Sequence, residues 1–120
     1  MGWKFEPGLS LSQQIVDKLR SDIIGGRYEC GTPFPTVRQL AEEASVNPNT
    51  MQKALTALEA EGLLVTQSTS GRVVTSDAAV IDEAREKVTA TNIGKIIRAA
   101  KELGINKDEL LEYIKKGWDA

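Results

Sequence analysis

The stretch "PTVRQLAEEASVNPNTMQKALTALEAEGLL", Pro35 to Leu64, decides the expected fold of this chain. Thr36 and Gln39 have the spacing of a capping box, in which each side chain bonds the other residue's backbone amide, so a helix is expected to begin there. Asn47 is a good N-cap for a second helix, because Pro48 then takes the first helical position, where no amide donor is needed. Two helices joined by such a short link form a helix-turn-helix motif.

The second of these helices, expected over residues 48–61, has a polar leading edge. Apolar residues recur at the spacing that turns its other side toward a core. Asn and Gln pair with adenine edges, Thr contacts bases or the thymine methyl, and Lys reaches guanine or phosphate in the major groove. The same residue types also occur on solvated helix starts, so the motif alone favours DNA reading only modestly. The candidate DNA-contacting residues on this edge are Asn49, Thr50, Gln52 and Lys53.

Arg38 is a candidate for phosphate binding. It lies near the start of the preceding helix, where free backbone amides and the helix dipole favour an anion. Its alternative role is a surface salt bridge with Glu42, four residues on, which would contribute only a few tenths of a kcal/mol.

A β-hairpin is predicted after the helix-turn-helix. Residues 63–67 and 72–75 are rich in Val and Thr, and the turn-forming residues 68–71 separate them. At the tip, Gly71 permits close approach of the backbone to DNA, and Arg72 can enter a minor groove or hold phosphate. The alternative is a plain turn with a solvated Arg.

A further helix is predicted before the helix-turn-helix. Ser10 and Gln13 repeat the capping-box spacing, and apolar residues then recur at helical intervals up to a pair of glycines. Residues 27–36 form a connection rich in turn formers. Three helices followed by a β-hairpin make a winged helix, so we expect residues 1–76 to form a winged helix-turn-helix DNA-binding domain.

The remaining residues, 77–120, predict a C-terminal helical hairpin. One long helix is expected to about residue 103, and the weak helix formers at 89–94 allow a kink or a break in it. A last helix is expected to begin after Asn106. The hairpin has more apolar residues than it could bury alone, so we expect a second copy of the chain to cover them. The residues expected at this homodimer interface are Ile81, Val88, Ile96, Ile97, Leu103, Leu110, Leu111 and Ile114.

The composition excludes several kinds of catalytic site. The chain contains one cysteine, Cys30, and no histidine, which excludes an internal disulfide, the usual zinc sites and catalytic Ser-His-Asp or Cys-His sets. No Asp/Glu pair stands in a recognisable catalytic context. We therefore expect no enzyme activity, no metal and no cofactor, and we interpret Cys30 as a small residue in a connection.

Charge and hydropathy restrict the partners. The net charge is −2, and neither half of the chain is basic overall, which counts against strong sequence-independent binding to nucleic acid. A local basic cluster remains compatible with specific binding. No apolar run is long enough to cross a bilayer, and the N-terminus lacks the pattern of a secretory signal. We therefore expect a cytoplasmic protein without a membrane partner.

On these motifs, residues 9–75 resemble the N-terminal domain of the GntR family of bacterial transcription regulators. The stretch "GTPFPTVRQLAEEASVNPNTMQKALTALEAEGLL" is particularly specific for the family. The "VNPNT" segment and the short helical tail resemble the YtrA-type subfamily, whose members lack a large effector domain and dimerise through two C-terminal helices. Many family members have Arg where this chain has Pro48, so the base readout must differ there.

The resemblance implies roles for individual residues. Arg38 matches a phosphate-binding position, and Gly71, with Arg72 beside it, matches the wing-tip glycine that approaches the minor groove. Asn49, Thr50 and Gln52 match contact positions on the recognition helix, with Lys53 adjacent to them.

We expect a sequence-specific DNA-binding regulator that binds a palindromic double-stranded operator as a homodimer, with half-sites about one helical turn apart. The resemblance implies repression by blocking RNA polymerase. The sequence does not identify a small-molecule effector. The alternative hypothesis is a winged-helix adaptor that binds proteins and has no sequence-specific DNA binding.

Overall fold

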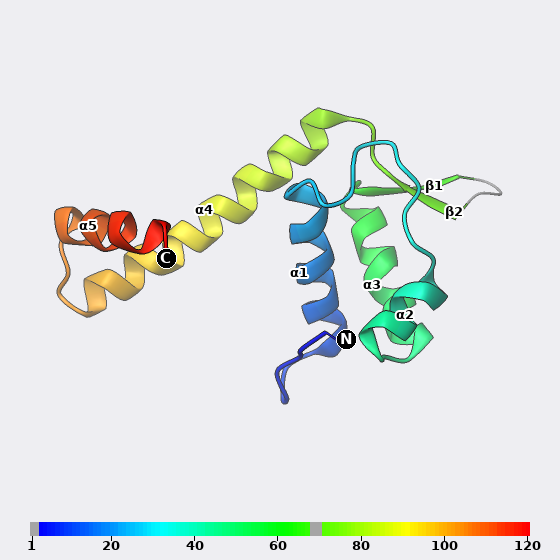
Figure 1. Cartoon of the computed structure of the whole chain (residues 1–120), viewed down its shortest axis with the longest axis horizontal. Helices are drawn as coiled ribbons and strands as arrows, with labels where there is room; N and C mark the ends of the chain where they lie inside the picture. Colours follow the sequence, from blue (N-terminus) through cyan, green and yellow to red (C-terminus); the bar gives the residue numbers. More distant parts are fainter. Residues whose placement is uncertain (1–2, 68–70) are drawn as a thin grey trace. The chain divides into compact units, whose positions relative to one another are not determined.

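The computed structural model describes residues 3–67 and 71–120, and the chain separates into two compact units, Met1–Ala84 and Arg85–Ala120. The described residues are mainly helical with a small antiparallel hairpin, which confirms the expected fold class. In chain order, the elements (Figure 1) are α1 (Leu11–Ile24), α2 (Val37–Ala44), α3 (Pro48–Ala60), β1 (Leu64–Gln67), β2 (Gly71–Val74), α4 (Ala78–Glu102) and α5 (Lys107–Trp118).

The starts of α2 and α3 are capped as the sequence predicts. Thr36 Oγ1 accepts a hydrogen bond from the Gln39 amide at 3.1 Å, and Gln39 Oε1 accepts one from the Thr36 amide at 2.9 Å. Asn47 Oδ1 accepts from the Asn49 amide at 2.7 Å, and Pro48 takes the first position of α3. Local side-chain contacts therefore fix where both helices begin.

The turn between α2 and α3 places a non-glycine residue in a left-handed conformation. Ser45 has φ 57°, and the Val46 amide donates to the Ala41 carbonyl at 3.0 Å. This bond is the one that closes a helix with a left-handed residue after its last turn. It ends α2 sharply, so that Asn47 can begin α3 after a very short link.

α3 lies at the centre of the first unit, where it packs against α1, α2 and β1 (Figure 1). Each apolar side chain buried in such a core contributes about 1.5–3 kcal/mol. These contacts fix the rotation of α3 about its own axis, because any other rotation would expose them. The largest fully buried side chains are Ile15, Leu19, Ile23, Leu40, Met51, Leu55, Leu58, Leu63, Leu64 and Val74.

The hairpin pairs β1 with β2 in an antiparallel register that runs from Leu64 opposite Val74 to Gln67 opposite Gly71. Leu64 and Val74 are buried in the core, so this end of the hairpin is anchored. Residues 68–70 of the expected turn lie outside the described residues.

The connection at residues 27–36 has a role that its turn-forming composition did not predict. Pro33 forms an isolated antiparallel bridge with Val73, and the Phe34 amide donates to the Arg72 carbonyl at 2.8 Å. β2 therefore has backbone partners along both of its edges.

α4 is a single helix over Ala78–Glu102, without the break that its sequence allows. The weak helix formers at residues 89–94 cost a few tenths of a kcal/mol each, and about 1 kcal/mol for Gly94, which is too little to end a helix of this length. Ile81, expected at the dimer interface, is instead 6% exposed and packs in the core of the first unit. The first turns of α4 are therefore part of the winged-helix unit.

The second unit is a helical hairpin, as the sequence predicts. Gly104 has φ 72°, and the Ile105 amide donates to the Ala100 carbonyl at 2.9 Å, which ends α4. Asn106 and Glu109 form a complete capping box that begins α5. None of the helices in the described part of the chain is long and apolar enough to cross a membrane.

Candidate DNA-binding surface

α3 turns its predicted leading edge toward solvent. Four apolar side chains on its opposite side are fully buried, so the helix is held in one orientation. Polar side chains three and four residues apart share one face of a helix. Asn49, Gln52 and Lys53 are exposed on that face, and Thr50 is half-buried at its border with the core.

Thr56 belongs to the same face, although its residue type alone did not mark it as a candidate. It is exposed one turn beyond Gln52, and Gln52 Nε2 donates to Thr56 Oγ1 at 3.4 Å. The signal that could have identified Thr56 is its spacing of four residues from Gln52. We define the reading stripe as Asn49, Gln52, Lys53 and Thr56.

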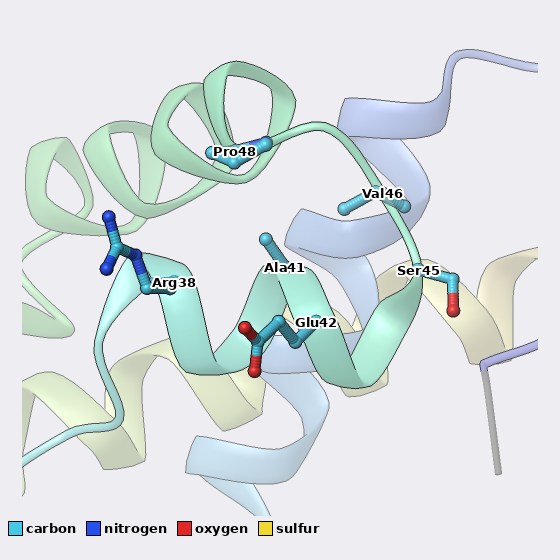
Figure 2. Close-up of a pocket in the computed structure, with 6 residues that line it drawn as sticks. All are labelled: Arg38, Ala41, Glu42, Ser45, Val46 and Pro48. Atoms are coloured by element: carbon cyan, nitrogen blue, oxygen red, sulfur yellow. The ribbon is translucent and has the colours of Figure 1, made fainter.

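Arg38 lies beside the start of α3, at an open hollow of about 470 Å³ that Pro48 also lines. Figure 2 shows Arg38 and Pro48 on the same side of α2. The alternative salt bridge with Glu42 is not formed: within residues 3–67 and 71–120, the exposed Arg38 guanidinium has no ion-pair partner. The structure therefore brings Arg38 together with the leading end of α3. The other residues that line this hollow are Ala41, Glu42, Ser45 and Val46.

Gly71 and Arg72 are placed differently from each other. Gly71 has φ +78°, and a Cβ atom built on it would meet no atom of the described residues within 4 Å, so its backbone is open to a partner. Arg72, by contrast, is turned back toward α3, where its Nε donates to Glu59 Oε1 at 2.6 Å, and its side chain is 16% exposed. The structure therefore leaves Gly71 accessible and engages Arg72 within the fold.

Glu59, in the last turns of α3, was not marked by sequence reasoning. Its carboxylate accepts a hydrogen bond from the Thr66 hydroxyl as well as from Arg72. The Thr66 bond, assisted by the bond and the charge of Arg72, lowers the pKa of Glu59 below its usual value, against the opposing effect of partial burial. The carboxylate is therefore held in its charged form.

The far end of α3 is tied to α1 by a second ionic contact. Arg20 donates from Nε and Nη2 to the two carboxylate oxygens of Glu61, at 2.8 Å and 2.7 Å, and from Nη1 to Asp17 Oδ1 at 2.9 Å. The bonds to Glu61 are the main cause that raises the pKa of Arg20. Together with the core, this contact fixes the position of the reading stripe within the first unit.

The second unit exposes most of the predicted interface residues. Of the ten large apolar side chains that are exposed among the described residues, eight belong to Arg85–Ala120. Val88 and Leu110 are half-buried. Ile93, Tyr113 and Trp118 are also exposed, and Ile93 and Trp118 have helical spacing with the predicted residues. The predicted residues that are exposed here are Ile96, Ile97, Leu103, Leu111 and Ile114.

The known proteins that this chain resembles are bacterial transcription regulators. Residues 11–74 match the family described as bacterial regulatory proteins of the gntR family. The chain is 30% identical over 112 residues to the HTH-type transcriptional regulator YhcF of Bacillus subtilis, with 93% of each chain covered. It is 29% identical over 105 residues to the HTH-type transcriptional repressor YtrA of Bacillus subtilis, covering 87% of this chain and 81% of YtrA.

The fold has a close match among solved structures. A GntR family transcriptional regulator from Listeria monocytogenes superposes with a TM-score of 0.89 and 30% identity, covering 93% of this chain and 98% of the other. These relatives are transcription regulators and not enzymes. The chain therefore belongs to the GntR family of bacterial regulatory proteins, is of the YtrA type, and is a DNA-binding transcription regulator.

Proposed function

We propose that this protein is a repressor that binds a palindromic operator as a homodimer and reads each half-site with α3. The observation that carries the proposal is the reading stripe. Its amide, hydroxyl and ammonium groups face solvent on a helix whose other side is fully buried. A major groove admits one such helix, and these groups bond base edges and phosphates there.

Arg38 supports the same docking geometry. Phosphate contacts position a protein on the duplex, and Arg is well suited to them because its guanidinium donates several hydrogen bonds. Arg38 lies in the first turn of α2, where backbone amides and the helix dipole also favour an anion. The Arg38 side chain, free of ion pairs in the described part of the chain, would hold a phosphate while α3 enters the groove.

The exposed apolar side chains of the second unit support the homodimer. Burying one large apolar side chain contributes about 1.5–3 kcal/mol. A two-fold contact uses the same surface of both copies, so each of these residues would be buried in each copy and would contribute two times to the dimer. Two-fold symmetry in the protein is matched by a palindrome in the DNA, with half-sites about 10 base pairs apart or a multiple of that distance. Gly71 of each copy would then approach the sugar-phosphate backbone of the DNA beside its half-site.

Repression follows from the site that such a dimer occupies. A dimer bound across a promoter would exclude RNA polymerase, and YtrA of Bacillus subtilis is itself a transcriptional repressor. Bacterial chromosomal DNA lies in the cytoplasm, so we propose that the protein is cytoplasmic.

The test is to incubate the full chain with fragmented genomic DNA, recover the bound fragments and sequence them. The expected result is one enriched motif with two-fold symmetry, whose affinity in fluorescence anisotropy falls as salt is raised and falls again when the sequence is scrambled. Sedimentation of the complex should give two chains per duplex. Absence of any enriched sequence, with equal affinity for scrambled DNA, would favour the protein-binding adaptor instead.

A further inference from the structure

We infer that Glu59 is a positioning residue, which fixes the hairpin to the recognition helix α3 so that Gly71 meets DNA at a set distance from the reading stripe. The inference rests on the proposed function, because it concerns how the hairpin, here called the wing, reaches the operator. Glu59 lies on α3, whereas its two partners lie on different strands of the wing, Thr66 on β1 and Arg72 on β2.

The position of the contact within the wing is what gives it this role. Thr66 and Arg72 face each other in the strand register, so one carboxylate holds both strands at the same rung. The next rung pairs Gln67 with Gly71. Among the described residues, the contact with Glu59 is therefore the last side-chain attachment to α3 before the open backbone of Gly71.

A two-stranded hairpin needs such an attachment, because on its own it is only marginally stable in water. Its inner end is anchored by Leu64 and Val74 in the core. Its outer half has exposed residues on β1, and the contacts with Glu59 join that half to α3. Without them, the backbone bond from the Phe34 amide to the Arg72 carbonyl would remain, but that bond joins β2 to the connection at residues 27–36 and not to α3.

The same geometry admits an opposite function, in which Glu59 masks a DNA-binding cation. In that case Arg72 would be a phosphate ligand held back by the carboxylate. The Thr66 bond favours positioning over masking, because neutralising Arg72 requires no second partner on the other strand. The two functions predict DNA affinity changes of opposite sign when Glu59 is replaced.

The experiment compares Glu59→Ala and Glu59→Gln with the unmodified protein on the operator recovered from the genomic selection. Both substitutions remove one negative charge, so both gain the same general attraction to DNA, and the amide introduced by Glu59→Gln would still offer one oxygen to the wing. Glu43→Gln is the matched charge control, since Glu43 is an exposed residue of α2 that does not line the hollow beside Arg38. Far-UV circular dichroism and thermal unfolding check that each variant is folded.

Positioning predicts that Glu59→Ala lowers operator affinity about tenfold, a loss of about 1.4 kcal/mol, and that Glu59→Gln recovers part of it. Hydroxyl-radical footprinting should show the protection beside each half-site weakened in Glu59→Ala while the protection under α3 remains. A purely structural loss would weaken both protections together. Thr66→Val, which removes one donor and keeps the Arg72 bond, should reproduce the selective loss in smaller measure and serves if Glu59→Ala does not fold.

Three outcomes would overturn the inference. Unchanged affinity and footprint in the folded variants would show that the contact does not position the wing. An affinity above that of Glu43→Gln would establish masking of Arg72. A footprint of the unmodified protein without protection beside the half-sites would remove the wing from the interface. Failure of the proposed function is distinct, because the unmodified protein would then show no preferred sequence at all.

Discussion

Arg20 of α1 donates two parallel hydrogen bonds, of 2.8 Å and 2.7 Å, to the two carboxylate oxygens of Glu61 at the C-terminal end of α3. Such bidentate pairs are stronger than single ionic contacts because the fork of the guanidinium matches the carboxylate. The pair joins two elements that are distant in sequence, so it acts on tertiary structure and not on helix propensity.

Arg20→Ala should therefore lower the free energy of unfolding by about 1 kcal/mol, a figure reduced for the solvent that reaches Glu61. A double-mutant cycle with Glu61→Ala, measured by urea unfolding at fixed protein concentration, isolates the pair from other losses. Arg20→Lys should retain less than half of the coupling energy, because an ammonium lacks the fork. A coupling energy near zero would show that the two side chains are held by the core alone.

The stability contributed by Glu59 should depend on acid pH. Its folded pKa is lowered, mainly by the Thr66 hydrogen bond and then by Arg72, from an ordinary value of 4.5. A lowered folded pKa means that the folded state binds its proton less tightly than the unfolded state. The contribution is therefore fully present above the unfolded pKa and is lost as the pH falls through the folded pKa.

Urea unfolding of the unmodified protein and of Glu59→Gln tests this between about pH 6 and pH 3. The difference in free energy of unfolding should be constant at the upper end and should shrink toward the lower end, since Gln does not titrate. A difference that grows with acidity would have the wrong sign for this contact.

Gln52 should read a base edge. Gln52→Ala leaves the buried side of α3 intact, so the fold should be kept, while operator affinity should fall at least tenfold, or about 1.4 kcal/mol. The variant should also lose discrimination at one base pair in each half-site. Gel-shift titration against the operator and its single-base variants measures both effects, and equal binding by the two proteins would refute the role.

Arg38 should contact phosphate, so Arg38→Ala should weaken binding uniformly across operator variants. The slope of log affinity against log salt should become shallower by about one unit for each lost phosphate contact. Glu42→Ala serves as the control, because it alters the same hollow without removing a cation. A sequence-dependent loss in Arg38→Ala would instead indicate a base contact.

Local signals explain why the sequence predicted the helix-turn-helix. The capping box of Thr36 and Gln39 and the pairing of Asn47 with Pro48 involve residues within one turn of each other, so spacing alone determines them. The engagement of Arg72 with Glu59 could not be predicted in this way. It depends on the register of the hairpin and on how the hairpin packs against α3, and both are tertiary.

The burial of Ile81 and the pairing of Pro33 with Val73 have the same explanation. Ile81 has the helical spacing of the apolar stripe that continues through α4, and only the packing of the first turns of α4 on the core distinguishes it from Ile96. Pro33 has the composition signal of a turn, whereas its extended conformation allows it to sit at the edge of a strand.

Ile97→Glu should separate dimerisation from folding. Ile97 lies in the second unit and is 41% exposed in a single chain, so a charged side chain there should leave the helices intact. In a homodimer interface, however, one unpaired carboxylate from each copy would be buried, at a cost of several kcal/mol. The variant should therefore sediment as a monomer at concentrations where the unmodified protein is a dimer.

Operator binding should follow the loss of the dimer. Two linked half-site contacts bind far more tightly than one, so affinity for the palindrome should fall about 100-fold or more, while affinity for an isolated half-site should stay the same. Leu9→Glu is the matched control, since Leu9 is an exposed apolar residue of the first unit and should affect neither measurement. A dimer that persists in Ile97→Glu would place the interface away from this face of α4, and the proposed alignment of two α3 helices would then have to be built on another contact.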